Sequence, residues 1–341
     1  MADFSFNRRE FIKAGLAGVC LVGIPEVPAA LAGEPEGTLI SNSGGIPLRP
    51  LGDTGVKVSI LCLGGHHIGR IPEDGEAVKM VRYAIDNGVT FIDNAWEYHH
   101  GRSEKIVGTA LKDGYRDKAF VMTKIHGRNR KEAQAQLEES LSRLDVEYVD
   151  LLQLHEVIYA DDPERIFAPD GAIEALEYAR QQGKARFVGF TGHKDPAIHL
   201  DMLSRDYSWD TVQMPVNAFD PHYRSFIKQV MPVLTERNIA PLGMKSMGSP
   251  WLLKSGAITA EEALNFAWSQ PVSTVVSGME SMDLLQQNID YARRFKPMSI
   301  KEQENLLART ASAAQDGKWE KYKTSKTFDG WVGRRIHDLP Q

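Results

Sequence analysis

The chain has 341 residues, of which 42% are hydrophobic and 25% charged. This composition suits a globular protein with a sizeable core, and the length is enough for one α/β barrel. The 40 basic and 45 acidic residues give a net charge of -5, and no run of Lys and Arg interleaved with aromatic residues occurs. We therefore expect no nucleic-acid partner and favour small-molecule chemistry.

Residues 1–32 have the pattern of a removable export signal. The pair Arg8 and Arg9 opens a basic segment, and the apolar stretch from Ala14 to Ile24 is too short to span a bilayer. The paired arginines predict the twin-arginine route, so we expect that export machinery as a partner and cleavage near Ala32. The mature protein would be periplasmic, without stable membrane insertion. An ordinary secretory signal that happens to contain two arginines is the alternative.

Residues 33–45 are interpreted as a linker between this signal and the folded region. Signal removal would take away Cys20 and leave Cys62 as the only thiol of the mature chain. A single thiol excludes an intramolecular disulfide and any cysteine-rich zinc or iron–sulfur site.

A β-hairpin and eight further strands follow. Turn residues Asp53 to Gly55 separate the hairpin strands, 46–51 and 56–59. The other strands are expected at 59–63, 89–93, 119–124, 149–155, 185–191, 211–214, 239–243 and 273–277. Between them lie helical patterns, the clearest beginning near Asp74 and ending at Gly88, and another carrying Leu137, Leu141 and Leu144.

These alternating strands and helices predict an α/β fold of the TIM-barrel type, a (β/α)8 barrel, over residues 46–295. The strands are nearly continuous apolar runs, as a parallel sheet covered by helices requires. An open doubly wound sheet is the alternative, but it usually carries a glycine-rich turn after its first strand. No Gly-x-Gly-x-x-Gly sequence occurs in this chain.

Residues 296–341 form a C-terminal extension of different character. Ile300 to Ala314 has helical spacing, and the remainder is aromatic but aperiodic. The extension either shapes a substrate pocket over the barrel rim or packs on the outside of the barrel. The sequence leaves both arrangements open.

Four polar side chains lie at or just after the carboxyl ends of consecutive predicted strands, where barrels hold their catalytic residues: Asp93, Tyr98, Lys124 and His155. Each alone has an ordinary explanation, such as a helix cap, a surface cation or core packing. Together they suit the reduction of a carbonyl, which requires a proton at the oxygen as hydride reaches the carbon. Tyr98 would donate that proton, Lys124 would lower the pKa of the Tyr98 hydroxyl, and Asp93 would hold Lys124. His155 would orient the carbonyl.

This arrangement, together with the segment Gly101-Arg102-Ser103-Glu104, resembles the catalytic tetrad region of the aldo-keto reductases over residues 46–295. The resemblance implies a barrel oxidoreductase that uses NAD(P)H to reduce an aldehyde or ketone, or that oxidises the alcohol. Some relatives carry a C-terminal cluster of iron–sulfur cysteines, which this sequence lacks. In this family the C-terminal segment often covers the active-site rim.

The resemblance also implies the residues that hold the nicotinamide end of the cofactor. Gln213 matches a family glutamine, and Thr191 stands where the family has a serine. Gly192 replaces the usual asparagine, and Met244 replaces an aromatic residue that stacks on the nicotinamide. Lys245 begins the segment that follows.

Cofactor choice is predicted from the segment after the eighth strand. Family members that prefer NADP have a basic residue there to pair with the 2'-phosphate. This chain has Glu280 at that position, which favours NADH over NADPH. Gln287 and Asn288 are the expected adenine contacts.

The substrate side of the rim is expected to contain His66, His67 and Trp96, with His126 nearby. So many imidazoles raise the alternative of a metal-dependent hydrolase on the same barrel, but no His-x-His follows the first strand, and no metal ligands are assigned. A non-catalytic dinucleotide-binding protein is a further alternative. The sequence names neither the carbonyl substrate nor the oligomeric state.

Overall fold

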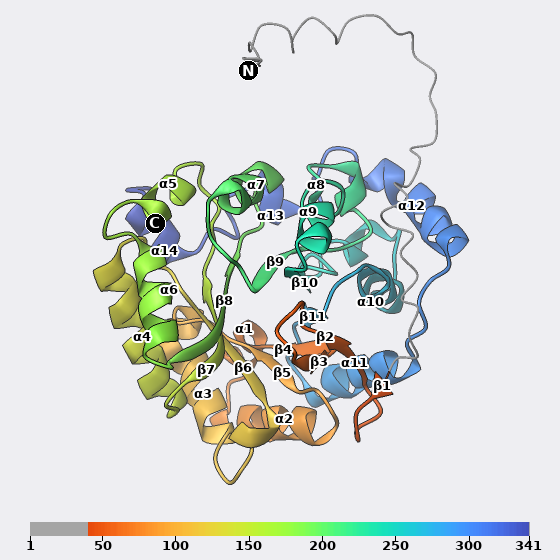
Figure 1. Ribbon diagram of the computed structural model, residues 1–341. Helices are drawn as coiled ribbons and strands as arrows, with labels where there is room; N and C mark the ends of the chain where they lie inside the picture. The colour runs from red at the N-terminus through yellow and green to blue at the C-terminus, as the bar shows by residue number, and fades with distance from the viewer. Residues whose placement is uncertain (1–39, 341) are drawn as a thin grey trace, which may run out of the picture.

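The computed structural model describes residues 40–340. The expected export signal therefore lies outside the described residues. Eight parallel strands close into a barrel in the order β10-β11-β4-β5-β6-β7-β8-β9, surrounded by an outer layer of helices (Figure 1). The fold is the predicted (β/α)8 barrel, and the open doubly wound sheet is excluded.

The barrel strands are β4 (Leu61–Gly64), β5 (Phe91–Asp93), β6 (Phe120–Ile125), β7 (Val149–Leu154), β8 (Ala185–Thr191), β9 (Thr211–Pro215), β10 (Ala240–Met244) and β11 (Thr274–Ser277). Every residue of β6 and β7 is buried. Burial on both faces is what a parallel sheet covered by helices requires, and it explains why these strands are continuous apolar runs.

The helices that follow the barrel strands are α2 (Asp74–Asp86), α3 (Arg102–Ala110), α4 (Arg130–Leu144), α6 (Ala172–Gln181), α7 (Pro196–Ser204), α9 (Met231–Glu236), α10 (Ala260–Ser269) and α11 (Met282–Arg294). In α2 the buried face includes Val81, Ala84 and Ile85. Helix α4 begins after Asn129, whose side chain accepts a hydrogen bond from the Glu132 backbone N–H. Such caps satisfy donors that the first helical turn leaves unpaired.

The N-terminal hairpin closes the end of the barrel opposite the site. A three-stranded antiparallel sheet joins β1 (Ile40–Ser41), β2 (Pro47–Pro50) and β3 (Lys57–Ser59). Leu51 and Val58 of this hairpin share one apolar cluster with Phe91 and Phe120, the first residues of β5 and β6. The hairpin thus covers the amino ends of the strands and leaves their carboxyl ends for chemistry.

The C-terminal extension contains α12 (Ile300–Ala314), α13 (Lys321–Thr324) and α14 (Trp331–Ile336). Helix α12 has the bounds expected from its spacing and begins at a capping box of Ser299 and Glu302. Within residues 40–340, no helix is long and apolar enough to cross a membrane. Cys62 is a buried free thiol.

Candidate active site

The four residues singled out from the sequence meet at the carboxyl ends of β5, β6 and β7. Asp93 ends β5, Lys124 is the penultimate residue of β6, and His155 directly follows β7. Tyr98 begins a short 3-10 helix, η2 (Tyr98–Gly101). The backbone N–H of Trp96 donates to the carbonyl of Lys124 at 2.9 Å, so the loop that carries Tyr98 is fixed against β6.

Lys124 is the centre of this group. Its ammonium donates to the Asp93 carboxylate, to the Asn94 carbonyl at 2.6 Å and to the Tyr98 hydroxyl at 3.1 Å. An ammonium has three N–H donors, so these three acceptors satisfy it fully. The Lys124 side chain is only 1% exposed, and a buried cation requires such pairing to remain charged. The geometry therefore holds a lysine cation directly against a tyrosine hydroxyl.

The pKa of the Tyr98 hydroxyl is shifted in the direction opposite to the one predicted from the sequence. Burial raises the pKa of the Tyr98 hydroxyl well above its ordinary value, and the charges of Asp93, Glu97 and Glu156 raise it further. The lowering of the Tyr98 pKa that we predicted is therefore wrong for the protein by itself, because burial disfavours the charged phenolate and the nearby carboxylates add to that effect. Tyr98 is a neutral phenol with a proton to donate.

His155 stands beside Tyr98, with their ring centroids 5.5 Å apart in an edge-to-face arrangement. The His155 residue is 6% exposed. Burial lowers the pKa of His155 well below its ordinary value, and the nearby His126 and Lys124 lower it further. His155 is thus a neutral imidazole, which can donate one hydrogen bond from whichever ring nitrogen carries its proton.

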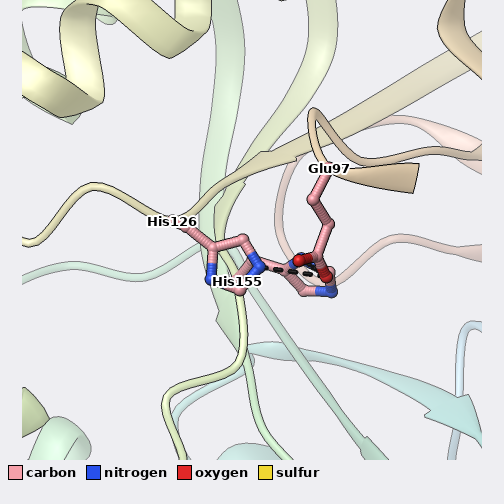
Figure 2. A group of neighbouring side chains, drawn as sticks. All are labelled: Glu97, His126 and His155. Carbon is pink, nitrogen blue, oxygen red and sulfur yellow. Dashed lines mark ion pairs between the residues drawn. The ribbon is translucent and has the colours of Figure 1, made fainter. Parts of the chain in front are cut away.

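Two further residues lie beside His155: Glu97, which was not singled out from the sequence, and His126, which was expected near the substrate side. Glu97 and His126 lie close to His155, and the three point toward one another (Figure 2). Glu97 Oε1 is 3.0 Å from His126 Nε2 and 3.4 Å from His155 Nδ1. The available sequence signal was position: Glu97 directly precedes Tyr98, and His126 directly follows β6.

This group contains polar atoms without a hydrogen-bond partner. Both ring nitrogens of His126, Nδ1 of His155 and Oε2 of Glu97 are buried and unpartnered. His126 is completely inaccessible to solvent. An unpartnered buried polar atom costs about 1–3 kcal/mol in stability. The geometry therefore leaves several buried hydrogen-bonding atoms of this group unused, among them one lone pair on each imidazole and one on the Glu97 carboxylate.

A second carboxylate and imidazole continue the same polar cluster. Nδ1 of His193 lies 3.1 Å from the Tyr322 carbonyl, which can only accept, so this nitrogen carries the proton. Nε2 of His193 faces Glu156 Oε1 at 3.7 Å. Burial alone would raise the pKa of Glu156, but His193, His126 and the Gly330 backbone N–H together lower it. Glu156 is therefore a buried carboxylate anion.

The C-terminal extension covers this rim. The Gly330 backbone N–H donates to Glu156 at 2.8 Å, and the Lys245 ammonium lies 4.7 Å from the centre of the Phe328 ring. Lys194 bonds the Asp329 carboxylate and the Ser325 carbonyl. Helix α14 lies beside α5 (Asp162–Phe167), where His337 contacts Asp162 at 3.1 Å (Figure 1). Both arrangements that the sequence left open occur: the segment from Ser325 to Gly330 lies over the rim, whereas α12 packs outside the barrel against α10 through Arg309 and Glu262.

The expected nicotinamide-binding residues lie on β8, β9 and β10. The Gln213 side-chain N–H donates to Asp93 at 3.3 Å, while its carbonyl oxygen is buried without a partner. That free acceptor fits the amide N–H of a nicotinamide. Thr191 is next to Met244, with its hydroxyl 3.9 Å from the sulfur. A Cβ on Gly192 would lie 2.2 Å from the Val157 carbonyl oxygen, so the chain has no room there for the family asparagine.

Two other residues expected at the cofactor, Lys245 and Glu280, differ in their surroundings. Lys245 has a positive φ of 58°, and burial lowers its pKa although Glu156 and Asp93 act in the opposite direction. Glu280 is paired with His67 at 2.6 Å and with Arg70 at 2.8 Å. The pairing of Arg70 with Glu280 was not predictable from the sequence, because the two residues are far apart along the chain.

The two residues expected at the adenine lie on α11. The Asn288 amide oxygen accepts from Ser277 at 2.9 Å, and its amide nitrogen donates to the Leu284 carbonyl at 2.7 Å. The Asn288 side chain is thus engaged within the protein. Gln287 is exposed and borders a surface hollow with Gln286 and Tyr291.

The expected substrate residues divide into two groups. His66 is exposed on the rim, and its ring centroid is 5.2 Å from that of Tyr98. His67 is held by Glu280. The Trp96 indole instead donates to Glu139 of α4 at 2.7 Å and stacks near Trp331 of the extension. The structure therefore places Trp96 against the outer helices rather than beside Tyr98.

A closed barrel with a lysine, a tyrosine, an aspartate and a histidine at its carboxyl end defines a class of barrel oxidoreductases. Residues 60–261 match the model of the aldo/keto reductase family, and the chain belongs to that family.

Individual relatives are more distant. The chain is 28% identical over 207 residues to aldo-keto reductase YhdN of Bacillus subtilis, covering 56% of this chain and 59% of the relative. It is 36% identical over 160 residues to L-galactose dehydrogenase of Arabidopsis thaliana, covering 43% of this chain and 49% of that protein. The chain thus spans about half to three fifths of these relatives' length. The holo form of aldo-keto reductase AKR11C1 from Bacillus halodurans has the same fold, with a TM-score of 0.67 at 22% identity over 81% of this chain and 99% of that one.

Proposed function

We propose that the protein reduces an aldehyde or ketone, or oxidises the corresponding alcohol, with a nicotinamide dinucleotide. One observation carries the proposal: the Lys124 ammonium is bonded at once to Asp93 and to the Tyr98 hydroxyl. In reduction, the bound cofactor supplies the hydride. The protein must then supply a proton to the oxygen, and a neutral tyrosine held by a lysine cation can do so.

Each side chain has a separate part in this step. Tyr98 donates its proton to the carbonyl oxygen and becomes a phenolate. Lys124 stabilises that phenolate, because its ammonium is 3.1 Å away. Asp93 holds the Lys124 ammonium in place, and His155 donates a hydrogen bond that orients the carbonyl. Gln213 supports the proposal on the cofactor side, because its buried carbonyl oxygen has no partner in the described structure.

A turnover assay tests the proposed reaction. Purified protein is mixed with NADH or NADPH and a panel of aldehydes, ketones and sugars, and loss of the reduced nicotinamide absorbance is followed. We expect carbonyl-dependent loss of absorbance with at least one member of the panel. Dinucleotide binding without turnover in either direction would instead favour a non-catalytic binding protein.

We propose that NADH is preferred over NADPH. The support is the carboxylate of Glu280, which repels a 2'-phosphate. Arg70 does not reverse this argument, because its guanidinium is already paired with Glu280. Fluorescence titrations with both cofactors decide the matter, and tighter NADPH binding would refute the preference. Glu280→Gln should narrow the difference by releasing Arg70, whereas Glu304→Gln, an exposed change on α12, should leave it as it is.

We also propose export of the protein through the twin-arginine route to the periplasm. The support is the Arg8-Arg9 pair and the short apolar stretch after it. In a bacterial host, replacing both arginines with lysine should abolish periplasmic accumulation and leave the precursor uncleaved. Unchanged export of the double variant would show an ordinary secretory signal. Because that route carries folded proteins, the chain could leave with its cofactor bound.

A further inference from the structure

We propose that Glu97, His126 and His155 form a binding site for one divalent transition-metal ion of the zinc class. These residues follow the carboxyl ends of three consecutive strands, β5, β6 and β7. Two imidazoles and one carboxylate are ligands that zinc and related ions accept. Nothing in the sequence pattern required these three residues to meet.

The spacing of the donor atoms fits a metal ion. A tetrahedral zinc site with bonds of about 2.0–2.1 Å places neighbouring ligand atoms about 3.3 Å apart. The two separations from Glu97 Oε1 are 3.0 Å to His126 Nε2 and 3.4 Å to His155 Nδ1. All three donors lie within 4.8 Å of one another. A small rotation of one imidazole brings His126 Nε2 and His155 Nδ1 to a similar separation. The fourth coordination position of the ion stays open for water or a substrate oxygen.

The unused lone pairs form the second, independent observation. The donor nitrogens of His126 and His155 are both buried and lack a hydrogen-bond partner. His126 lies only 3.0 Å from the Glu97 carboxylate, yet the alignment does not make a hydrogen bond. A metal ion accepts these lone pairs directly. Figure 2 shows the three side chains converging on one point.

The charge of the surroundings also favours a cation. A Cβ added to Gly330 would lie 2.8 Å from Glu97 Oε2 and 2.6 Å from Glu156 Oε2, so both carboxylates converge under the extension. The nearby cations Lys124 and Arg128 already form ion pairs, Lys124 with Asp93 and Arg128 with Asp162. His193 faces Glu156, and Lys245 lies near Glu156 as well. Glu97 is left with two imidazoles, and a divalent ion supplies the missing positive charge.

The backbone around the ligands is rigid, as a metal site requires. The buried Arg128 guanidinium donates to the carbonyls of His126 at 2.7 Å and of His155 and Glu156 at 2.9 Å each. The Gln136 side chain accepts from the backbone N–H of His126 at 2.7 Å. These bonds fix the distance between the two histidines before any ion arrives. These contacts hold the backbone of both histidines, while neither ring nitrogen of His126 has a hydrogen-bond partner in the described structure.

The ion would have a definite role in the proposed carbonyl reduction, and this part of the inference rests on that proposed function. Metal binding at Nδ1 of His155 leaves its proton on Nε2, at a different edge of the ring. The tautomer of His155 is then fixed as an Nε2–H donor. The same positive charge offsets the effect of the Glu97 carboxylate on Tyr98. The ion would thus fix the tautomer of His155 and the charge around Tyr98, the two residues proposed to contact the substrate oxygen.

Zinc titration of the purified full-length protein tests the site. The protein is stripped with a chelator and titrated with Zn²⁺ against a chromophoric competitor, without cofactor or carbonyl. We expect one equivalent to bind. Glu97→Gln and His126→Gln should weaken binding by more than the roughly 10- to 100-fold that loss of an outer-shell partner causes. Glu139→Gln on α4 and His222→Gln, beside Thr310, should leave the affinity unchanged.

Two outcomes overturn the site: no Zn²⁺ binding by the wild type, or equal affinity in Glu97→Gln. If either ligand variant fails to fold by circular dichroism, Co²⁺ is added to the stripped wild type. A visible spectrum typical of four- or five-coordinate Co²⁺ supports the site, and its absence contradicts it. Because this test involves no turnover, zinc binding with an inactive enzyme would refute the proposed function alone. Turnover without zinc binding would refute the site alone.

Discussion

The two halves of the barrel rim are built in different ways. At the ends of β5 to β7, Lys124 bonds both Asp93 and Tyr98, and the strands together with the loop after β5 hold these residues in place. At the ends of β8 to β10, the polar groups instead contact the C-terminal extension, as Lys194 does, or remain free, as the Gln213 oxygen does. The hydrogen bonds of Lys124 are complete without a ligand, whereas Glu97, His126 and His155 beside it keep buried polar atoms without partners. The second half contacts the extension and leaves the Gln213 carbonyl oxygen free to accept a hydrogen bond from a bound molecule.

The difference shows which parts of the proposed chemistry the fold secures. Proton transfer needs a few groups at fixed distances, and the barrel supplies them from adjacent strands. Cofactor binding needs a longer contact surface, and the residues proposed for it are spread over β8, β9, β10 and the segment after β11. Changes in the first half should therefore reduce the chemical step, whereas changes in the second should reduce binding or stability.

Lys124→Met should cause a large loss. The methionine fills most of the same volume but removes the cation that stabilises the Tyr98 phenolate. We expect kcat to fall by about 10³-fold, within the range that general acid catalysis contributes, with little change in cofactor affinity. Steady-state kinetics and cofactor titration check this. The exposed Lys105→Met on α3 is the control, and a variant with more than half of the normal kcat would contradict the assignment.

Lys323→Met should lower the free energy of unfolding by weakening the attachment of the extension to the second half of the rim. The buried Lys323 ammonium bonds Asp220 at 2.7 Å and Glu320 at 2.9 Å, and all three side chains are completely buried. Removing the cation leaves two buried carboxylates near each other, which costs about 3–5 kcal/mol. Urea unfolding measures the loss, and the exposed Lys326→Met provides the comparison. A change below about 1 kcal/mol would show that the extension is not anchored there.

The pH dependence of stability probes His199, which is packed behind Gly192 between Phe190 and Phe226. Burial lowers the pKa of His199 to about 3. Between pH 6.5 and 3 the unfolded imidazole binds a proton that the folded one does not. The folded state therefore loses stability as the pH falls below 6.5, by about 1.4 kcal/mol per pH unit from this residue.

Urea unfolding at pH 6.5 and pH 5.5 measures this effect. His199→Phe should lose less stability over that interval than the wild type, and the exposed His100→Gln should match the wild type. Equal slopes in wild type and His199→Phe would mean that the buried imidazole does not control the acid response.

Gln213→Leu should have the smallest effect of this series. It removes the free acceptor proposed for the nicotinamide amide and one weak donor to Asp93. We expect cofactor affinity to fall by about tenfold, equal to about 1.4 kcal/mol, with kcat within a few-fold of the wild type. Titration with NADH gives the affinity. A fall in kcat without a change in cofactor affinity would mean that Gln213 acts in proton transfer rather than in cofactor binding.

The fold was largely accessible from the sequence. The eight predicted barrel strands agree with the structure to within two residues at each end. The reason is that parallel strands buried on both faces are continuous apolar runs, which turn residues and amphipathic helices separate. The short strand β1 (Ile40–Ser41) was missed, because two exposed residues carry no alternating pattern.

The site was accessible in part. Asp93, Lys124 and His155 were placed at the rim because residues at strand ends share one edge of a barrel. The direction in which side chains point could not be predicted from the sequence. Trp96 was therefore assigned to the substrate side, although its indole bonds to Glu139. Pairings between distant segments were also hidden, such as Arg70 with Glu280. The pKa of Tyr98 was predicted in the wrong direction, because its change depends on the burial of the whole cluster.

Tyr98→Phe tests the central claim most directly. The substitution removes one hydroxyl from a ring that is otherwise kept in place by His155 and His66. Carbonyl reduction by wild type and variant is compared under conditions where both are saturated with the same cofactor. The account predicts a loss of kcat of about 10²- to 10⁴-fold, with cofactor affinity unchanged. Turnover of the variant at a rate close to that of the wild type would contradict it.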